Sequence, residues 1–235
     1  MLKKSLSLCL VLTMMFGLTA CSNDDSKPDP DNQTNPTDNA VTKEERPFTE
    51  SDGLIKYFTI NGENVCLPET VGEYVKYLEK IGTKVELGDT GKTVDEAPEL
   101  NAGGVSSMVA FLKVYLDDSE DEWQWFGIRY ENDTDEDLPV ADCKVTQITL
   151  DYDTITEEEN HHGIDSIVFI TNENEEIPMD GKYASNKIYK LIGAAQQNTD
   201  GHLHYSDDQG YKYEMVTENQ KGILTRMVIT YPQDQ

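Results

Sequence analysis

The chain contains four histidines, and imidazole is the side chain that zinc and related metals most often use as a ligand in proteins. On a β-strand, His202 and His204 would point to the same face, as two zinc ligands can. His161 and His162 are adjacent and would point apart, and no cysteine or helix-spaced partner accompanies either pair. Because both pairs also stand beside turn glycines, the sequence favours solvent-exposed loop histidines, and we predict no metal site.

Acidic runs offer a second kind of cation site. Residues 133–137 have carboxylates at alternate positions, as the first part of an EF-hand loop does. The glycine that an EF-hand needs at its sixth position is Leu138, and the glutamate that it needs at its twelfth is Lys144. A second run, residues 151–153, fails at its fifth position, which is Ile155. We interpret both runs as solvated turns, with weak divalent-cation binding as the alternative, and we expect no cofactor.

The arrangements typical of nucleophilic catalysis are missing from the sequence. It has no Gly-x-Ser-x-Gly turn, and no cysteine stands near a histidine. The run Gly-x-x-Gly-Lys-Thr at residues 88–93 is shorter than a phosphate-binding loop. Carboxylates are too numerous for any pair to stand out. We therefore predict that the protein is not an enzyme and has no catalytic residues.

Both tryptophans stand in one strand-like run. Trp123 and Trp125 would share a face with Gly127, while Gln124 and Phe126 take the opposite face. An aromatic pair of this kind can bind a carbohydrate or a peptide, and the alternative is that one ring covers the core. Trp123 and Trp125 are therefore the candidate ligand-binding residues.

Two segments of the chain carry the same order of features. In the first, a strand-like run around Phe58 is followed by a Leu-Pro pair and an amphipathic helix. In the second, a run around Phe169 is followed by an Ile-Pro pair and a shorter helix. Three strand-like runs follow each helix, and the last of them, residues 145–152 and 224–231, alternate alike. The sequence therefore predicts two tandem repeats, residues 50–156 and residues 157–235.

Local signals define the elements of the first repeat. Asn61-Gly62 suits a type I′ turn, in which both central residues need positive φ, and this turn would pair Phe58 with Val65. Thr70 and Glu73 form a capping box at the start of the helix. Each helix should lie across its own sheet. We predict an α+β fold in which each repeat packs one helix on an antiparallel sheet of three to four strands, after a disordered N-terminal tether.

The net charge of −26 comes from 45 acidic and 19 basic side chains. A surface this negative repels the phosphates of nucleic acids, so a nucleic acid partner is excluded. The same charge favours a protein partner with a basic surface. The charge thus narrows the class of partner without identifying it.

The N-terminus has the pattern of a signal peptide. Two lysines precede an apolar run, residues 6–18, which is too short to span a bilayer core of about 30 Å. The run ends in Leu-Thr-Ala-Cys at residues 18–21, which resembles the lipobox of bacterial lipoproteins. The resemblance implies cleavage after Ala20 and a diacylglyceryl thioether on Cys21, so that two acyl chains hold the protein on the extracytoplasmic face of a cell membrane. An ordinary secretory signal is the alternative.

We therefore assign residues 1–20 to a lipoprotein signal peptide and residues 21–49 to the lipidated cysteine and a disordered acidic linker. A Gram-positive surface and an outer membrane are both open as locations. Cys66 and Cys143 are the cysteines that remain. Outside the cytoplasm they can form a disulfide, and the alternative is two buried thiols.

The folded part also carries a resemblance. From residue 54 to residue 152, a short strand, Leu-Pro, an amphipathic helix and the run Asp-Cys-Lys-Val-Thr at 142–146 are similar to uncharacterised Gram-positive lipoproteins. The second half, with Gly181, Ser185 and Gly193 around a short helix, resembles the repeat of beta-lactamase-inhibitor-like and small outer-membrane-assembly lipoproteins. The resemblance implies a helix-on-sheet module that binds other proteins. We therefore expect a non-catalytic interaction or accessory role in the cell envelope, with solute or divalent-cation binding as the alternative.

Overall fold

The computed structural model describes residues 48–108, 110–118, 122–151, 164–179, 185–192, 201–218 and 223–233. Arg46–Gln235 form one compact unit. The predicted signal peptide, the lipidated Cys21, the linker as far as residue 47, and His161 and His162 lie outside the described residues. No described helix is long and apolar enough to cross a membrane.

Four strands form the smaller sheet, in the order β2-β1-β7-β8. The first hairpin has the predicted turn, because Asn61 and Gly62 have φ values of 51° and 84°, and the predicted pairing of Phe58 with Val65 is confirmed. β1 also pairs with β7, and Phe58 lies opposite Phe169. The strands are β1 (Ile55–Ile60), β2 (Glu63–Cys66), β7 (Ile167–Thr171) and β8 (Glu176–Pro178).

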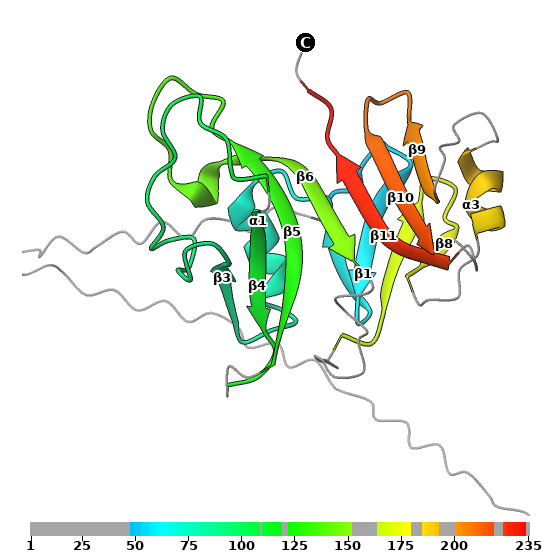
Figure 1. The fold of residues 1–235 in the computed structure, drawn as a ribbon, viewed down its shortest axis with the longest axis horizontal. Coiled ribbons are helices and arrows are strands. Elements are labelled where there is room, and N and C mark those ends of the chain that lie inside the picture. The colour runs from blue at the N-terminus through cyan, green and yellow to red at the C-terminus, as the bar shows by residue number, and fades with distance from the viewer. Residues whose placement is uncertain are drawn as a thin grey trace, which may run out of the picture. The chain divides into compact units, whose positions relative to one another are not determined.

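Seven strands form the larger sheet, in the order β3-β4-β5-β6-β11-β10-β9, and neighbouring strands in it are antiparallel. Figure 1 shows β6 and β11 meeting at the middle of this sheet. The strands are β3 (Lys84–Leu87), β4 (Phe111–Tyr115), β5 (Trp123–Glu131), β6 (Lys144–Asp151), β9 (His202–Ser206), β10 (Lys212–Glu218) and β11 (Ile223–Thr230).

The described helices are short: α1 spans Val71–Leu78, α3 spans Ser185–Ile192, and a 3-10 turn, η1, spans Val140–Asp142. The predicted cap of α1 is confirmed, because the Thr70 side chain accepts a hydrogen bond from the Glu73 backbone N–H at 3.2 Å. The buried face of α1 includes Tyr74, whose ring meets the ring of Phe126 on β5 edge-on at 6.3 Å.

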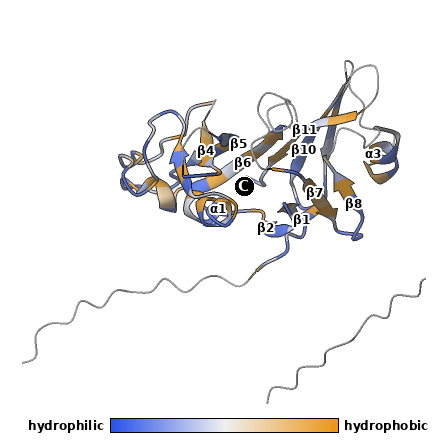
Figure 2. Ribbon diagram, turned by 90° about the horizontal axis from the view of Figure 1, so that it is seen from below, coloured by the Kyte–Doolittle hydropathy of each residue, from blue (hydrophilic) through white to orange (hydrophobic). Residues whose placement is uncertain are grey.

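The structure has two layers. Figure 2 shows the larger sheet as one layer, with α1 and the smaller sheet side by side in the other. Buried apolar residues from both sheets and from α1 form a single core between them. A polar contact also joins the layers, since the Asp207 carboxylate accepts hydrogen bonds from the Leu54 backbone N–H and the Tyr213 hydroxyl, both at 2.8 Å.

The predicted α+β fold of two tandem repeats, each with its own helix on its own sheet, is wrong. The described chain is mostly β, and both sheets take strands from both predicted segments, because β1 pairs with β7 and β6 pairs with β11. The physical reason is the length of the helices. Each has eight residues and is about 12 Å long. A helix of that length covers only part of one face of the larger sheet, so the smaller sheet packs beside α1 and buries the rest of that face.

Cys66 and Cys143 are free and buried in the structure, so the disulfide considered from the sequence is not formed there. The Cys143 thiol lies 3.6 Å from the carbonyl oxygen of Pro139. Burial, with smaller contributions from Asp142 and Asp133, raises the pKa of this thiol to about 11 from an ordinary 9.0. The fold therefore holds this cysteine in its unreactive, protonated form.

We predict that iodoacetamide alkylates Cys143 at pH 8 at least about 100-fold more slowly in the folded protein than in urea, because the raised pKa alone lowers the thiolate population by about that factor. The unfolded thiol also ionises first as pH rises from about 9 to 11, so this group lowers the free energy of unfolding over that interval. Peptide mass spectrometry measures the rate. Equal rates in both states, or a peptide cross-linked between Cys66 and Cys143, would contradict the structure.

Candidate functional site

Among the described residues, most of the charged, aromatic and histidine side chains that could form a site lie on the side of the larger sheet that points away from the core. Along β5, Gln124 and Phe126 are buried against the core, whereas Trp123 and Trp125 point outward, so the predicted alternation is confirmed. We call the outward-pointing residues of this sheet the outer face. They include Lys84, Glu86, Phe111, Lys113, Tyr115, Trp123, Trp125, Arg129, Gln147, Thr149, Asp151, His202, His204, Ser206, Lys212, Glu214, Arg226, Val228 and Thr230.

Aromatic rings occupy one end of the outer face, and we call this set the aromatic ladder: Phe111, Trp125, Trp123 and Tyr115. Trp125 stacks on Phe111 with ring centroids 4.1 Å apart and on Trp123 at 5.2 Å. The Lys113 ammonium lies 4.5 Å from the Trp123 ring centroid and 4.4 Å from that of Tyr115, which are cation–π distances. Trp125 is 42% exposed, the most of any ladder ring.

Tyr115 is held at its end of the ladder by charged partners. Its hydroxyl donates a 2.8 Å hydrogen bond to Glu86, whose other oxygen lies 2.7 Å from the Lys84 ammonium. Burial by itself would raise the pKa of Glu86, but the hydrogen bonds from Lys84 and Tyr115 keep it below its ordinary value. Glu86 therefore stays ionised and orients the tyrosine ring.

A depression of about 550 Å³ lies in the middle of the outer face. Its lining includes the cationic side chains of Arg129, Lys212 and Arg226, and the acidic side chain of Glu214. Arg226 donates a 2.6 Å hydrogen bond from Nε to Asp151. The Nε–H of Arg129 is buried and has no hydrogen-bond partner in the described part of the chain. An unsatisfied buried donor costs about 1–3 kcal/mol.

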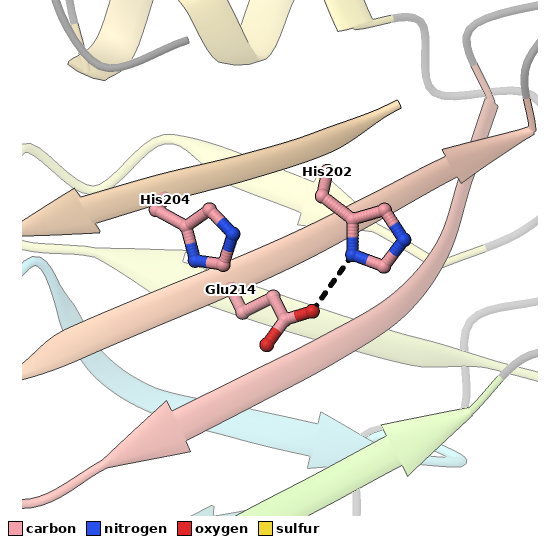
Figure 3. Close-up of side chains that lie close together, drawn as sticks. All are labelled: His202, His204 and Glu214. Carbon is pink, nitrogen blue, oxygen red and sulfur yellow. Dashed lines mark hydrogen bonds and ion pairs between the residues drawn. The ribbon is translucent and has the colours of Figure 1, made fainter. Parts of the chain in front are cut away.

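The far edge of the outer face holds His202, His204 and Glu214, which we call the histidine cluster. The two histidines are on β9, and Glu214 lies directly opposite His204 on β10. Nδ1 of His202 lies 2.8 Å from a carboxylate oxygen of Glu214, within hydrogen-bonding distance (Figure 3). One ligand atom from each of the three residues lies within 4.8 Å of the others, which is the only such group among the described residues.

The candidate site residues from the sequence can now be placed in the structure. Trp123 and Trp125 stand side by side, as expected. His202 and His204 lie on β9, within a strand-like run that the sequence predicts after the second helix, so the interpretation of them as loop histidines is wrong. Residues 133–137 form an exposed turn around the Asn132 side chain, which accepts from the Thr134 N–H at 3.0 Å and donates to the Glu136 carbonyl at 2.7 Å.

Sequence reasoning missed Phe111, Arg129 and Glu214. Each lies ten or more residues along the chain from the residues that it joins, so no short motif could reveal it. The sequence did hold one indication of a site. Arg129 and Arg226 are two of only three arginines in a very acidic chain, and each stands at an outward-pointing position within a strand.

Comparison of the chain with protein-family models, curated proteins and solved structures finds no match. The lipoprotein and repeat resemblances therefore stay predictions, and the functional argument depends on the geometry of the outer face.

We predict that Gly88→Ala disorders the aromatic ladder, because a Cβ atom at Gly88 would lie 1.7 Å from the Phe111 ring. The displaced ring should lower the free energy of unfolding by about 1–3 kcal/mol and shift tryptophan emission. Gly91→Ala is the control, because its Cβ would meet no atom within 4 Å although its φ is +63°. That variant should lose stability through backbone strain alone and keep the wild-type emission. Identical emission from both variants would refute the stacking geometry.

Proposed function

We propose that this is a non-catalytic, lipid-anchored protein on the extracytoplasmic face of a cell membrane, and that it binds a protein partner through the outer face. The observation that carries the proposal is the composition of that face. Both tryptophans of the chain and two of its three arginines lie on one side of one sheet. Tryptophan, tyrosine and arginine are the residues that most often dominate the binding energy of protein interfaces.

The packing of the ladder favours a protein partner over a sugar. A sugar ring stacks on the open face of an aromatic ring, but the Trp125 ring is flanked by Phe111 at 4.1 Å and by Trp123 at 5.2 Å. The ladder therefore presents ring edges and the Lys113 ammonium to solvent. Rigid rings whose rotamers are fixed before binding lose little entropy when a partner packs on them.

The charge of the outer face favours an acidic segment on the partner. The net charge of the whole chain had suggested a basic partner, but the depression is lined by Arg129, Lys212 and Arg226. These three cations outnumber the nearby carboxylates, which are Glu214 in the lining and Asp151, the partner of Arg226. Negative charge elsewhere on the surface would repel an acidic partner from other approaches. This difference in charge between the depression and the rest of the surface therefore directs an acidic partner toward the outer face.

A solute-binding role is the second candidate. It is favoured by the volume of the depression, about 550 Å³, which falls within the range of small-molecule sites. The two candidates differ in size of ligand, so a covalent capture experiment separates them.

We predict that an aromatic photoreactive amino acid at position 125, which keeps a ring in the ladder, cross-links in intact cells to a discrete protein, and that 0.5 M salt during irradiation reduces the yield because it screens the charge contacts. Position 48 is the matched control, since Phe48 is 45% exposed and packs on Tyr57 of β1, away from the outer face. Equal adducts at both positions, or none at position 125, would refute the proposed interface. Loss of protein adducts with retention of a small-molecule adduct would support the solute-binding role.

We also predict that Trp125→Ala lowers binding of the captured partner by about 30-fold, the loss typical of a hot-spot residue, without unfolding the protein because the ring is partly exposed. Phe48→Ala should bind as the wild type does. Titration calorimetry gives both affinities, and circular dichroism checks both folds.

The anchor is tested separately. Metabolic labelling with palmitate should mark the wild-type protein, and Cys21→Ser should abolish the label and release the chain from membranes, because one thioether carries the diacylglyceryl group. A labelled Cys21→Ser variant, or an unlabelled wild-type protein, would contradict the lipoprotein assignment and leave the outer-face proposal standing.

A further inference from the structure

We propose that His202, His204 and Glu214 bind a divalent transition-metal ion of the zinc class. The sequence argued against such a site because no third ligand stands near the two histidines. The β9–β10 pairing supplies it, since Glu214 lies directly opposite His204 although ten residues separate them in the chain.

The geometry of the cluster suits a small metal ion. His202 and His204 are two residues apart on β9, so their rings leave the sheet on the same side, nearly parallel at an interplanar angle of 17°. Ligands at zinc distances of about 2.0–2.1 Å in a tetrahedral site stand about 3.3 Å from one another. The ligand atoms of this cluster lie 2.8 Å apart for His202 and Glu214 and all within 4.8 Å (Figure 3), so small side-chain rotations bring them to that spacing.

The ligand types select the metal. Two imidazoles and one carboxylate favour zinc and neighbouring transition metals, whereas calcium and magnesium take oxygen ligands almost exclusively. This separates the cluster from the exposed carboxylates elsewhere on the chain, which offer only oxygen.

Three protein ligands leave one position of a tetrahedral zinc ion open. The His202 and Glu214 side chains are 39% and 36% exposed, so water can reach the ion. His204 and Glu214 also line the depression that contains Lys212 and Arg226. An anionic group from a partner could therefore complete the coordination shell while it contacts these two cations.

The test is titration of the purified protein with Zn²⁺, and with Co²⁺ as a spectroscopic probe, in a large excess of Ca²⁺ that saturates the oxygen-only sites. We expect one ion per chain and the visible absorption of low-coordinate Co²⁺ with nitrogen ligands. His204→Ala and Glu214→Gln should each weaken the binding of Zn²⁺ by about 10- to 100-fold. Glu214→Gln keeps the shape of the side chain, and His204 is exposed, so circular dichroism should show both variants folded.

His161 and His162 provide the matched control, because their joint replacement by alanine removes two imidazoles from the chain and none from the cluster. That double variant should bind zinc with wild-type affinity. The proposal fails if the wild type binds no zinc in excess calcium, if His204→Ala and Glu214→Gln bind as the wild type does, or if the control variant loses affinity as they do. None of these results would alter the proposed partner interface, which depends on the tryptophans and the arginines of the outer face.

Discussion

The structure depends on one long-range contact, the antiparallel pairing of β6 with β11. It places Ile148 opposite Ile229, both fully buried, and it brings Asp151 and Arg226 together across a separation of 75 residues. Without this pairing the larger sheet would divide into two parts of four and three strands, each with a new unpaired edge. Unpaired edges expose backbone hydrogen-bonding groups, so the joined sheet is favoured by backbone hydrogen bonds as well as by burial.

The same pairing makes the outer face a single surface. Arg129 on β5 lies opposite Gln147 on β6, and Gln147 lies opposite Thr230 on β11. Thr230 in turn lies opposite Lys212 on β10, so a row of side chains runs across the boundary between β6 and β11. The ladder lies on the side of β6 and the histidine cluster on the side of β11. A sheet holds such residues at fixed spacings, which is what binding without large rearrangement requires.

Features that depend on a few neighbouring residues could be predicted from the sequence. The Asn61-Gly62 turn, the Thr70 cap and the alternation of Trp123 and Trp125 are local, and all three are present. Alternation shows which side chains share a face, but it does not show which strand lies beside which. The sequence therefore could not place β11 against β6 or Glu214 against His204, and the two similar segments were assigned separate sheets although their strands combine.

Native-state hydrogen exchange tests the joined sheet most directly, because backbone amides exchange at rates set by the opening of their own strand. If β6 and β11 are the central strands of one sheet, their hydrogen-bonded amides should be among the slowest to exchange and should share one free energy of opening, equal to that of global unfolding. The edge strands β3 and β9 should exchange faster. Two separate free energies, one for residues 84–151 and another for residues 202–230, would show that the halves unfold independently and would contradict the account.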